Sequence, residues 1–127
     1  MQRQTIRSGG NTVNSAIKNM KQTIDSKEML AKVAKEMMVT IRQALAIFDE
    51  PAEVSKEEYT ELIIVSVSNR NTYLLTLAEV ECIQKAVEPY MREYGDNISC
   101  VFDTYPVVLN TGIVHIPTMQ FSIYMER

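Results

Sequence analysis

Residues 98–126 constrain the fold of this chain more than any other stretch. Apolar and polar side chains alternate along two segments of it, residues 98–109 and 113–126. Alternation with a period of two places the apolar side chains on one face of a β-strand. The two segments flank a short polar turn, which predicts an antiparallel β-hairpin. Because sliding the pairing by one residue would exchange the faces, the pattern selects the register in which Asn110 pairs with Ile113.

The predicted hairpin has one apolar face and one polar face. In this register Asp103 lies opposite Gln120, and Tyr105 lies opposite Thr118. Such cross-strand pairs stabilise a solvent-exposed face, and they also offer hydrogen bonds to a small ligand or to a protein partner. The candidate binding residues belong to this face and to the turn near residue 70, and they are Arg70, Asp103, Tyr105, Thr118, Gln120 and Tyr124.

The end of the hairpin, residues 107–116, is predicted to project from the sheet, and we call it the hairpin tip. The register sets Pro106 opposite Pro117, and a proline cannot donate to a strand ladder. We therefore expect no neighbouring strand beside the hairpin tip. The only histidine, His115, lies there, and Cys100 is about 26 Å away along the hairpin. These two side chains cannot share a metal, so we interpret His115 as a structural or interface residue.

Residues 13–48 show the apolar periodicity of α-helices. Val13, Ile17, Met20 and Ile24 fall on one helical face, and a second stripe runs from Leu30 to Phe48. We predict two helices with a break near Asp25, which would be an N-cap in a capping box with Glu28. The alternative is one long helix with a coiled-coil-like seam.

The second helical stripe carries apolar side chains on more than one face. A single sheet face would not cover that much apolar surface. We therefore expect part of this helix to contact another copy of the chain. The interface candidates come from this helix and from the hairpin tip, and they are Met37, Met38, Ile41, Leu45 and His115.

The middle of the chain predicts a linker, a strand and a capped helix. Residues 49–58 are acidic and contain a proline, which favours a linker. The β-branched run at residues 62–67 predicts a buried strand, and residues 73–75 a short return strand. Thr76 followed by Glu79 is a capping box that opens a helix over residues 77–94, with Leu77 expected on its inner face. Pro89 is expected to kink or break the last turn of that helix.

The sequence lacks the motifs of the common enzyme classes. It contains no nucleophile elbow, no phosphate-binding loop and no H-E-x-x-H motif. The two cysteines have neither a disulfide framework nor a zinc-ligand spacing. We therefore expect a protein that is not an enzyme and holds no cofactor or metal. The polar N-terminus has no signal-peptide pattern and no segment is apolar enough to span a bilayer, so we expect an intracellular (cytoplasmic) or virion protein.

Charge is distributed unevenly along the chain. Residues 1–48 carry a net charge of +5, and residues 49–127 carry −8. Opposite charges on the two halves favour attraction within one chain or between copies, whereas a nucleic-acid partner is the less favoured interpretation. Residues 1–12 are expected to form a flexible polar arm that takes part in association.

Together these patterns predict an α+β fold over residues 13–127. A helical segment (residues 13–48) packs on a small, mainly antiparallel sheet built from residues 62–76 and the hairpin of residues 98–126, with the capped helix inserted between them. We interpret the chain as a self-associating assembly or adaptor protein, by analogy with subunits of rings, shells or viral connectors. The alternative is a small-ligand or nucleotide-binding module that uses the polar face of the hairpin.

Overall fold

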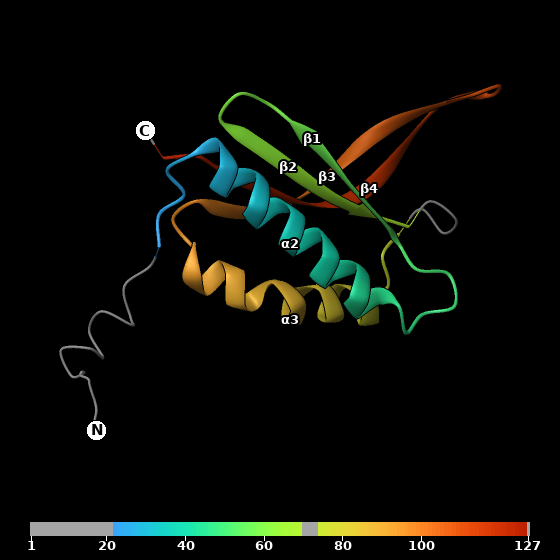
Figure 1. Ribbon diagram of the computed structural model, residues 1–127. Helices are drawn as coiled ribbons and strands as arrows, with labels where there is room; N and C mark the ends of the chain where they lie inside the picture. Colours follow the sequence, from blue (N-terminus) through green and yellow to red (C-terminus); the bar gives the residue numbers. More distant parts are fainter. Residues whose placement is uncertain (1–21, 70–73, 127) are drawn as a thin grey trace.

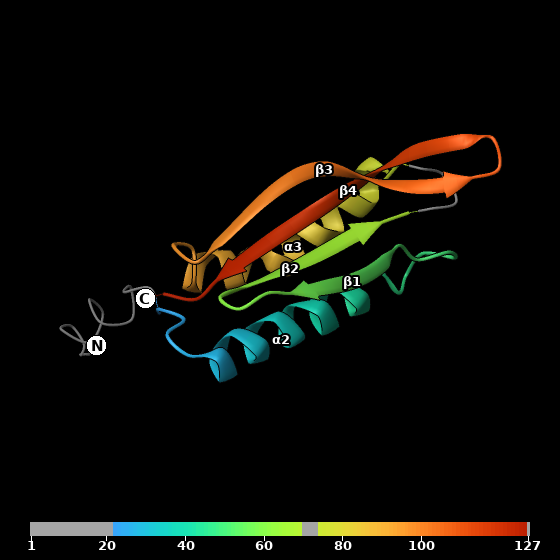
Figure 2. The same ribbon diagram turned by 90° about the horizontal axis from the view of Figure 1, so that it is seen from above.

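Two helices and four strands follow one another along the part of the chain that the computed structural model describes, residues 22–69 and 74–126. Their order is α2 (Lys27–Leu45), β1 (Glu53–Glu58), β2 (Leu62–Ser68), α3 (Leu77–Glu93), β3 (Ile98–Leu109) and β4 (Gly112–Tyr124). The strands form one antiparallel sheet in the order β1-β2-β4-β3. Both helices cover the same face of this sheet (Figures 1 and 2). The predicted α+β class is confirmed.

Helix α2 begins one residue later than predicted. The Ser26 hydroxyl accepts a hydrogen bond from the backbone N–H of Met29 at 3.1 Å, which satisfies a donor that a helix start leaves without a partner. The cap is therefore Ser26, and the prediction of Asp25 is wrong. Residues 22–25 lie outside the helix, so one continuous helix through this point is also wrong. The predicted helix over residues 13–24 and the arm of residues 1–12 fall mainly or wholly outside the described residues.

The apolar residues of α2 are covered within the chain itself. Met37, Met38, Ile41 and Leu45 are buried in the core that α2 forms with the sheet and α3. The prediction that they form an intermolecular interface is therefore wrong. Apolar side chains occupy more than one face of α2 because the helix packs against α3 on one side and against the sheet on another, and each of these neighbours covers part of its surface.

Strand β1 replaces part of the predicted acidic linker. Residues 53–58 pair with β2 along their whole length, although only Val54 among them is even partly buried. The strand is at the sheet edge, where polar side chains remain solvated. In β2 the side chains of Ile63, Val65 and Val67 point into the core. Leu74 and Leu75 lie outside any strand, and Tyr73 is outside the described residues.

The capping box of α3 is confirmed. The Thr76 hydroxyl accepts a hydrogen bond from the Glu79 backbone at 3.1 Å, and the Glu79 carboxylate accepts one from the Thr76 backbone at 2.8 Å. Leu77 was predicted on the inner face but is 74% exposed, whereas Glu79 is buried. The helix turns its capping carboxylate inward, which directs Leu77 to solvent. It continues through Pro89 to Glu93, so the proline does not end it.

The hairpin of β3 and β4 has the predicted faces but a different register. Leu109 pairs with Gly112 across Asn110 and Thr111, so each residue of β3 lies opposite a partner two positions earlier in β4 than predicted. Gly112 adopts a φ of +136°, a conformation that glycine favours and that suits the tight turn. A shift of two positions leaves the faces unchanged. Pro106 consequently lies opposite His115, and the predicted pairing of Pro106 with Pro117 is wrong.

Candidate interaction surfaces

The hairpin tip projects beyond the rest of the sheet, as predicted. Strand β4 pairs with β2 only from Met119 to Tyr124, whereas its pairing with β3 continues to Gly112. Figure 1 shows the two strands continuing past the helices and past the other strands. The six residue steps from Thr118 to Gly112 correspond to about 20 Å. The outer part of the hairpin tip is therefore held by its own two strands at a distance from the body of the fold, whereas Ile116 at its base is buried.

Apolar side chains are exposed at the hairpin tip. Val108 and Ile113 are directly paired, so they lie on the same face, and they are 79% and 63% exposed. Leu109 is also exposed beside them. No Asp, Glu, Lys or Arg occurs between Asp103 and Glu126. A projecting, uncharged surface with neighbouring exposed apolar side chains is typical of an interaction site.

The alternation of the sequence placed Val108 and Ile113 together on the apolar face of the hairpin, and the structure pairs them on one face. Alternation alone did not indicate that these two side chains are exposed. The helices cover this face only beside the main sheet, so the same alternation that buries Phe121 exposes Ile113. The uncharged stretch between Asp103 and Glu126 was the signal that could have identified the surface.

A second apolar surface lies between α3 and the edge strand β3. A groove of about 250 Å³ is lined from both elements and from β4, by Gln84, Val87, Glu88, Met91, Cys100, Met119 and Phe121, and we call it the α3–β3 groove. The Cys100 residue is exposed, yet its surroundings desolvate the thiolate and raise the pKa of the thiol. A smaller hollow of about 130 Å³ follows at the other end of α3, where Phe102 is 65% exposed. The helix-facing side of β3 is thus incompletely covered.

The two edges of the sheet differ in chemistry. The outer edge strand β1 is short and carries Lys56, Glu57 and Glu58, all exposed. Strand β3 is twice as long and exposes Val101 and Phe102 on its two faces. Charged side chains and short length protect an edge from pairing with another chain. The β3 edge has less of this protection than the β1 edge.

The polar candidate residues do not form one site. Asp103 and Thr118 are paired, but Thr118 is buried and its hydroxyl donates to the Asp103 carbonyl at 3.2 Å. Gln120 lies opposite Val101 rather than Asp103, and Tyr124 is near the opposite end of the sheet. Arg70 and the side chain of Tyr105 are outside the described residues. The predicted pairings of Asp103 with Gln120 and of Tyr105 with Thr118 are therefore wrong.

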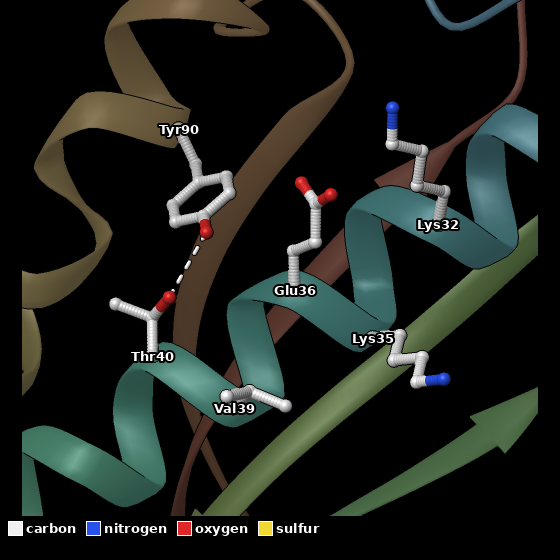
Figure 3. Close-up of a pocket in the computed structure, with 6 residues that line it drawn as sticks. All are labelled: Lys32, Lys35, Glu36, Val39, Thr40 and Tyr90. Atoms are coloured by element: carbon white, nitrogen blue, oxygen red, sulfur yellow. Dashed lines mark hydrogen bonds between the residues drawn. The ribbon is translucent and has the colours of Figure 1, made fainter.

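A further groove, of about 430 Å³, lies on the outer side of the two helices (Figure 3). Its centre is a hydrogen bond of 2.9 Å between the hydroxyls of Thr40 and Tyr90, which joins α2 to α3. Lys32, Lys35 and Glu36 lie around it, and the Lys35 side chain extends away from Tyr90. The groove combines charges of both signs with a bond that fixes the helix pair. We interpret it as part of the helix–helix contact.

His115 is exposed on the hairpin tip. Among residues 22–69 and 74–126, no group of three or more His, Cys, Asp or Glu side chains is arranged to hold a metal ion. Within the same residues, neither helix combines the length and the apolar character needed to cross a membrane.

Comparison with known proteins adds no functional information. The chain matches no protein-family model, and no curated protein or solved structure is significantly similar to it. A function can therefore be inferred only from the exposure, shape and charge of the candidate surfaces.

Proposed function

We propose that this protein is a non-enzymatic subunit that associates with further copies of itself, and that the hairpin tip makes the contact. The observation that carries the proposal is the exposed apolar pair of Val108 and Ile113 on a projecting, uncharged hairpin. The folded body does not use these side chains, since they lie beyond the helices and beyond the strands that pair with the main sheet. Their exposure has an energetic cost that burial against a partner would remove.

The geometry favours a contact between unlike surfaces. A hairpin tip that reaches about 20 Å from its own body can lie against the body of a neighbouring copy. A contact of this kind repeats from copy to copy and generates a ring or an open array. The proposed role is therefore that of an assembly subunit, for example in a viral or other large particle. The same proposal includes an intracellular or virion location and association with another protein besides further copies of this chain.

Burial of the apolar pair supplies part of the association energy. Full burial of a valine or isoleucine side chain contributes about 1.5–3 kcal/mol, so the two together contribute at most about 3–6 kcal/mol. Stable interfaces bury roughly 800 Å² on each partner, which is more than two side chains provide. Other residues of the hairpin and a complementary surface must then take part, with Val108 and Ile113 at the centre.

Sedimentation velocity of wild type and of Ile113→Asp tests the proposal. We expect wild type at tens of micromolar to sediment with a mass well above that of the 14.5 kDa monomer. We expect Ile113→Asp to sediment as a monomer and to show the circular dichroism spectrum of a folded chain. An unpaired charge buried in a contact costs about 3 kcal/mol or more, which weakens association by about a hundredfold. Thr111→Asp is the matched control, because it adds the same charge in the adjacent turn and removes no apolar side chain.

Each other result overturns a defined part of the proposal. If wild type is a monomer throughout, self-association is wrong, and the small-ligand-binding module becomes the better hypothesis. If wild type and Ile113→Asp form the same oligomer, the hairpin tip is not the contact. If Thr111→Asp dissociates as fully as Ile113→Asp, added charge rather than loss of apolar contact explains the effect.

A further inference from the structure

Strand β3 directs part of its backbone to an open edge of the sheet. It is the last strand in the order β1-β2-β4-β3 over the described residues (Figure 2). Along an antiparallel pair, residues that bond to the partner alternate with residues whose N–H and C=O groups point away from it. The backbone N–H of Tyr124 donates to the carbonyl of Asn97 at 2.7 Å. The next residue, Ile98, therefore directs its backbone groups to the open edge.

The prolines of the hairpin agree with this alternation. Pro106 lies opposite His115, and Pro117 lies opposite Thr104. Counted from Asn97, both pairs fall at positions that make no backbone bond within the hairpin, which suits residues that have no N–H to donate. The backbone groups that face the open edge before the first proline belong to every second residue, which are Ile98, Cys100, Phe102 and Thr104.

Two features limit how this edge can be paired. Pro106 cannot donate to a further strand, so an unbroken ladder has room only from Ile98 to Thr104. Asp103 is the only charged residue of β3, and its carboxylate accepts a hydrogen bond from the Thr104 backbone at 2.8 Å. A partner strand that places another carboxylate opposite Asp103 would be repelled.

A second copy of β3 meets both limits when Val101 lies on the twofold axis. In a twofold dimer the same strand meets itself in the antiparallel direction, so Val101 lies opposite Val101 of the other copy. Ile98 then lies opposite Thr104, and Cys100 lies opposite Phe102. Each residue that faces the open edge is thereby paired with another such residue, as an antiparallel ladder requires.

The side chains of this pairing are also complementary. Asp103 falls opposite Ser99 of the other copy, whose hydroxyl can donate to the carboxylate in place of the Thr104 backbone. On the helix-facing side, Phe102 falls beside Cys100, which lines the α3–β3 groove. Phe102 is 65% exposed in the single chain. Directly opposite side chains are about 5 Å apart, so its ring would cover the β3 side of the groove.

The neighbouring registers lack this fit. An axis at Phe102 sets Ile98 opposite Pro106, which has no N–H. An axis at Asp103 sets the two carboxylates opposite each other. An axis at Cys100 shortens the ladder, because the pairing would run past the start of β3 at Ile98.

We propose that the β3 edge pairs antiparallel with β3 of a second copy about Val101, and that Phe102 of each copy covers the α3–β3 groove of the other. This contact is distinct from that of the hairpin tip and does not rest on it. The paired edge is about 24 Å long and about 10 Å across. Its area is well below the roughly 800 Å² that each partner of a stable interface buries. The contact is therefore weak by itself and does not hold a dimer together at tens of micromolar.

Disulfide trapping detects a weak contact and maps its register. The experiment uses the full chain with Cys82→Ser and Cys100→Ser, so that one introduced cysteine is the only thiol. It also carries Ile113→Asp, which removes the proposed hairpin-tip contact. Protein at hundreds of micromolar is mildly oxidised, and the covalent dimer is followed by denaturing electrophoresis without reductant.

The introduced cysteine replaces Val101 in the test variant and Ser99 or Asp103 in two matched controls. All three residues are exposed and lie on the same face of β3. On the twofold axis, residue 101 forms a pair without backbone bonds, whose Cα atoms are about 4.5 Å apart, and a disulfide spans that distance. Two copies of residue 99, or two of residue 103, are offset by about 14 Å along the strands, which a disulfide does not span.

We expect Val101→Cys to form covalent dimers at least about tenfold faster than either control, because only this position meets the geometry of the bond. Ser99→Cys and Asp103→Cys should link little when each is alone. They should link readily when mixed, since residue 99 of one copy lies opposite residue 103 of the other. All variants should keep the circular dichroism spectrum of the parent, because the three positions are exposed.

Four results would overturn the proposal. Equal rates at the three positions would indicate random collision, and a faster rate at Ser99 or Asp103 than at Val101 would indicate another register. Absence of linkage at every position, or of linkage in the mixed sample, would show that the edges do not pair in this way. These outcomes are separate from the test of the hairpin tip, because sedimentation at tens of micromolar reports the tip and the position that links reports the β3 edge.

Discussion

The capping box of α3 allows a quantitative prediction, because its two residues differ in burial. Thr76→Ala removes the acceptor of a single backbone N–H, that of Glu79, and caps of this kind contribute about 1 kcal/mol. Glu79→Ala removes two interactions, since the carboxylate accepts from the Thr76 backbone at 2.8 Å and from the Asn69 amide at 3.3 Å. Glu79 is also buried, so its loss leaves donors without an acceptor in a poorly solvated place.

The expected cost of Glu79→Ala is about 2–3 kcal/mol, because hydrogen bonds to a charged group contribute about 1.5–3 kcal/mol each and the second one here is long. For a domain of this size 1 kcal/mol corresponds to roughly 4 °C in Tm. We therefore expect Thr76→Ala to lower Tm by about 4 °C and Glu79→Ala by about 10 °C. The double variant should lose less than the sum, since both residues belong to one network.

Thermal unfolding followed by circular dichroism at one fixed protein concentration measures these shifts, because association would make Tm depend on concentration. Glu81→Ala is the matched control, as Glu81 is exposed on the same helix, and it should change stability by at most about 0.5 kcal/mol. The reasoning is refuted if Glu79→Ala costs no more than Thr76→Ala, because burial and the second hydrogen bond would then contribute nothing.

Three further predictions concern the core, the turn and the C-terminal end of α3. Met38 is buried, so Met38→Glu should unfold the chain, and circular dichroism should show the loss of structure. A folded monomeric variant would contradict this and would instead place Met38 in an interface. Gly112 has a φ of +136° with open space around an added Cβ, so Gly112→Ala should cost about 1 kcal/mol through backbone strain alone; an unchanged Tm would contradict this. Burial, with the nearby charges of Glu93 and Glu36, raises the pKa of Tyr94. The neutral phenol therefore contributes to the stability of the folded state below about pH 10, the ordinary pKa of tyrosine. That contribution is lost as the pH rises through the raised pKa. Urea unfolding across that range should show a smaller alkaline loss for Tyr94→Phe than for wild type, and identical profiles would refute the assignment.

Side-chain alternation predicted the faces of the hairpin but could not determine its register. A register shifted by two positions leaves every side chain on the same face, so the hydrophobic pattern is equally satisfied by both. The turn decides between them, because Gly112 provides the backbone conformation that the observed connection across Asn110 and Thr111 uses. Giving the glycine more weight than the apolar pairing would have led to the observed register.

Burial partners were harder to predict than secondary structure. Met37 and Ile41 are buried because α2 packs against both α3 and the sheet, but a sequence pattern states only that a face is covered and not which element covers it. Strand β1 was missed for a related reason. An edge strand that buries little more than part of Val54 has no apolar alternation, and its existence depends on pairing with β2.

The unequal edges of the sheet limit how far pairing between chains can propagate. If the β3 edges of two copies paired, each copy would contribute its long, weakly protected edge to the new contact, and the outer edges of the joined sheet would both be β1. Those edges carry Lys56, Glu57 and Glu58, which oppose further strand addition. Strand pairing of this kind would therefore stop at two chains and would not extend into a fibril. A larger particle would have to grow through a surface other than the sheet edges.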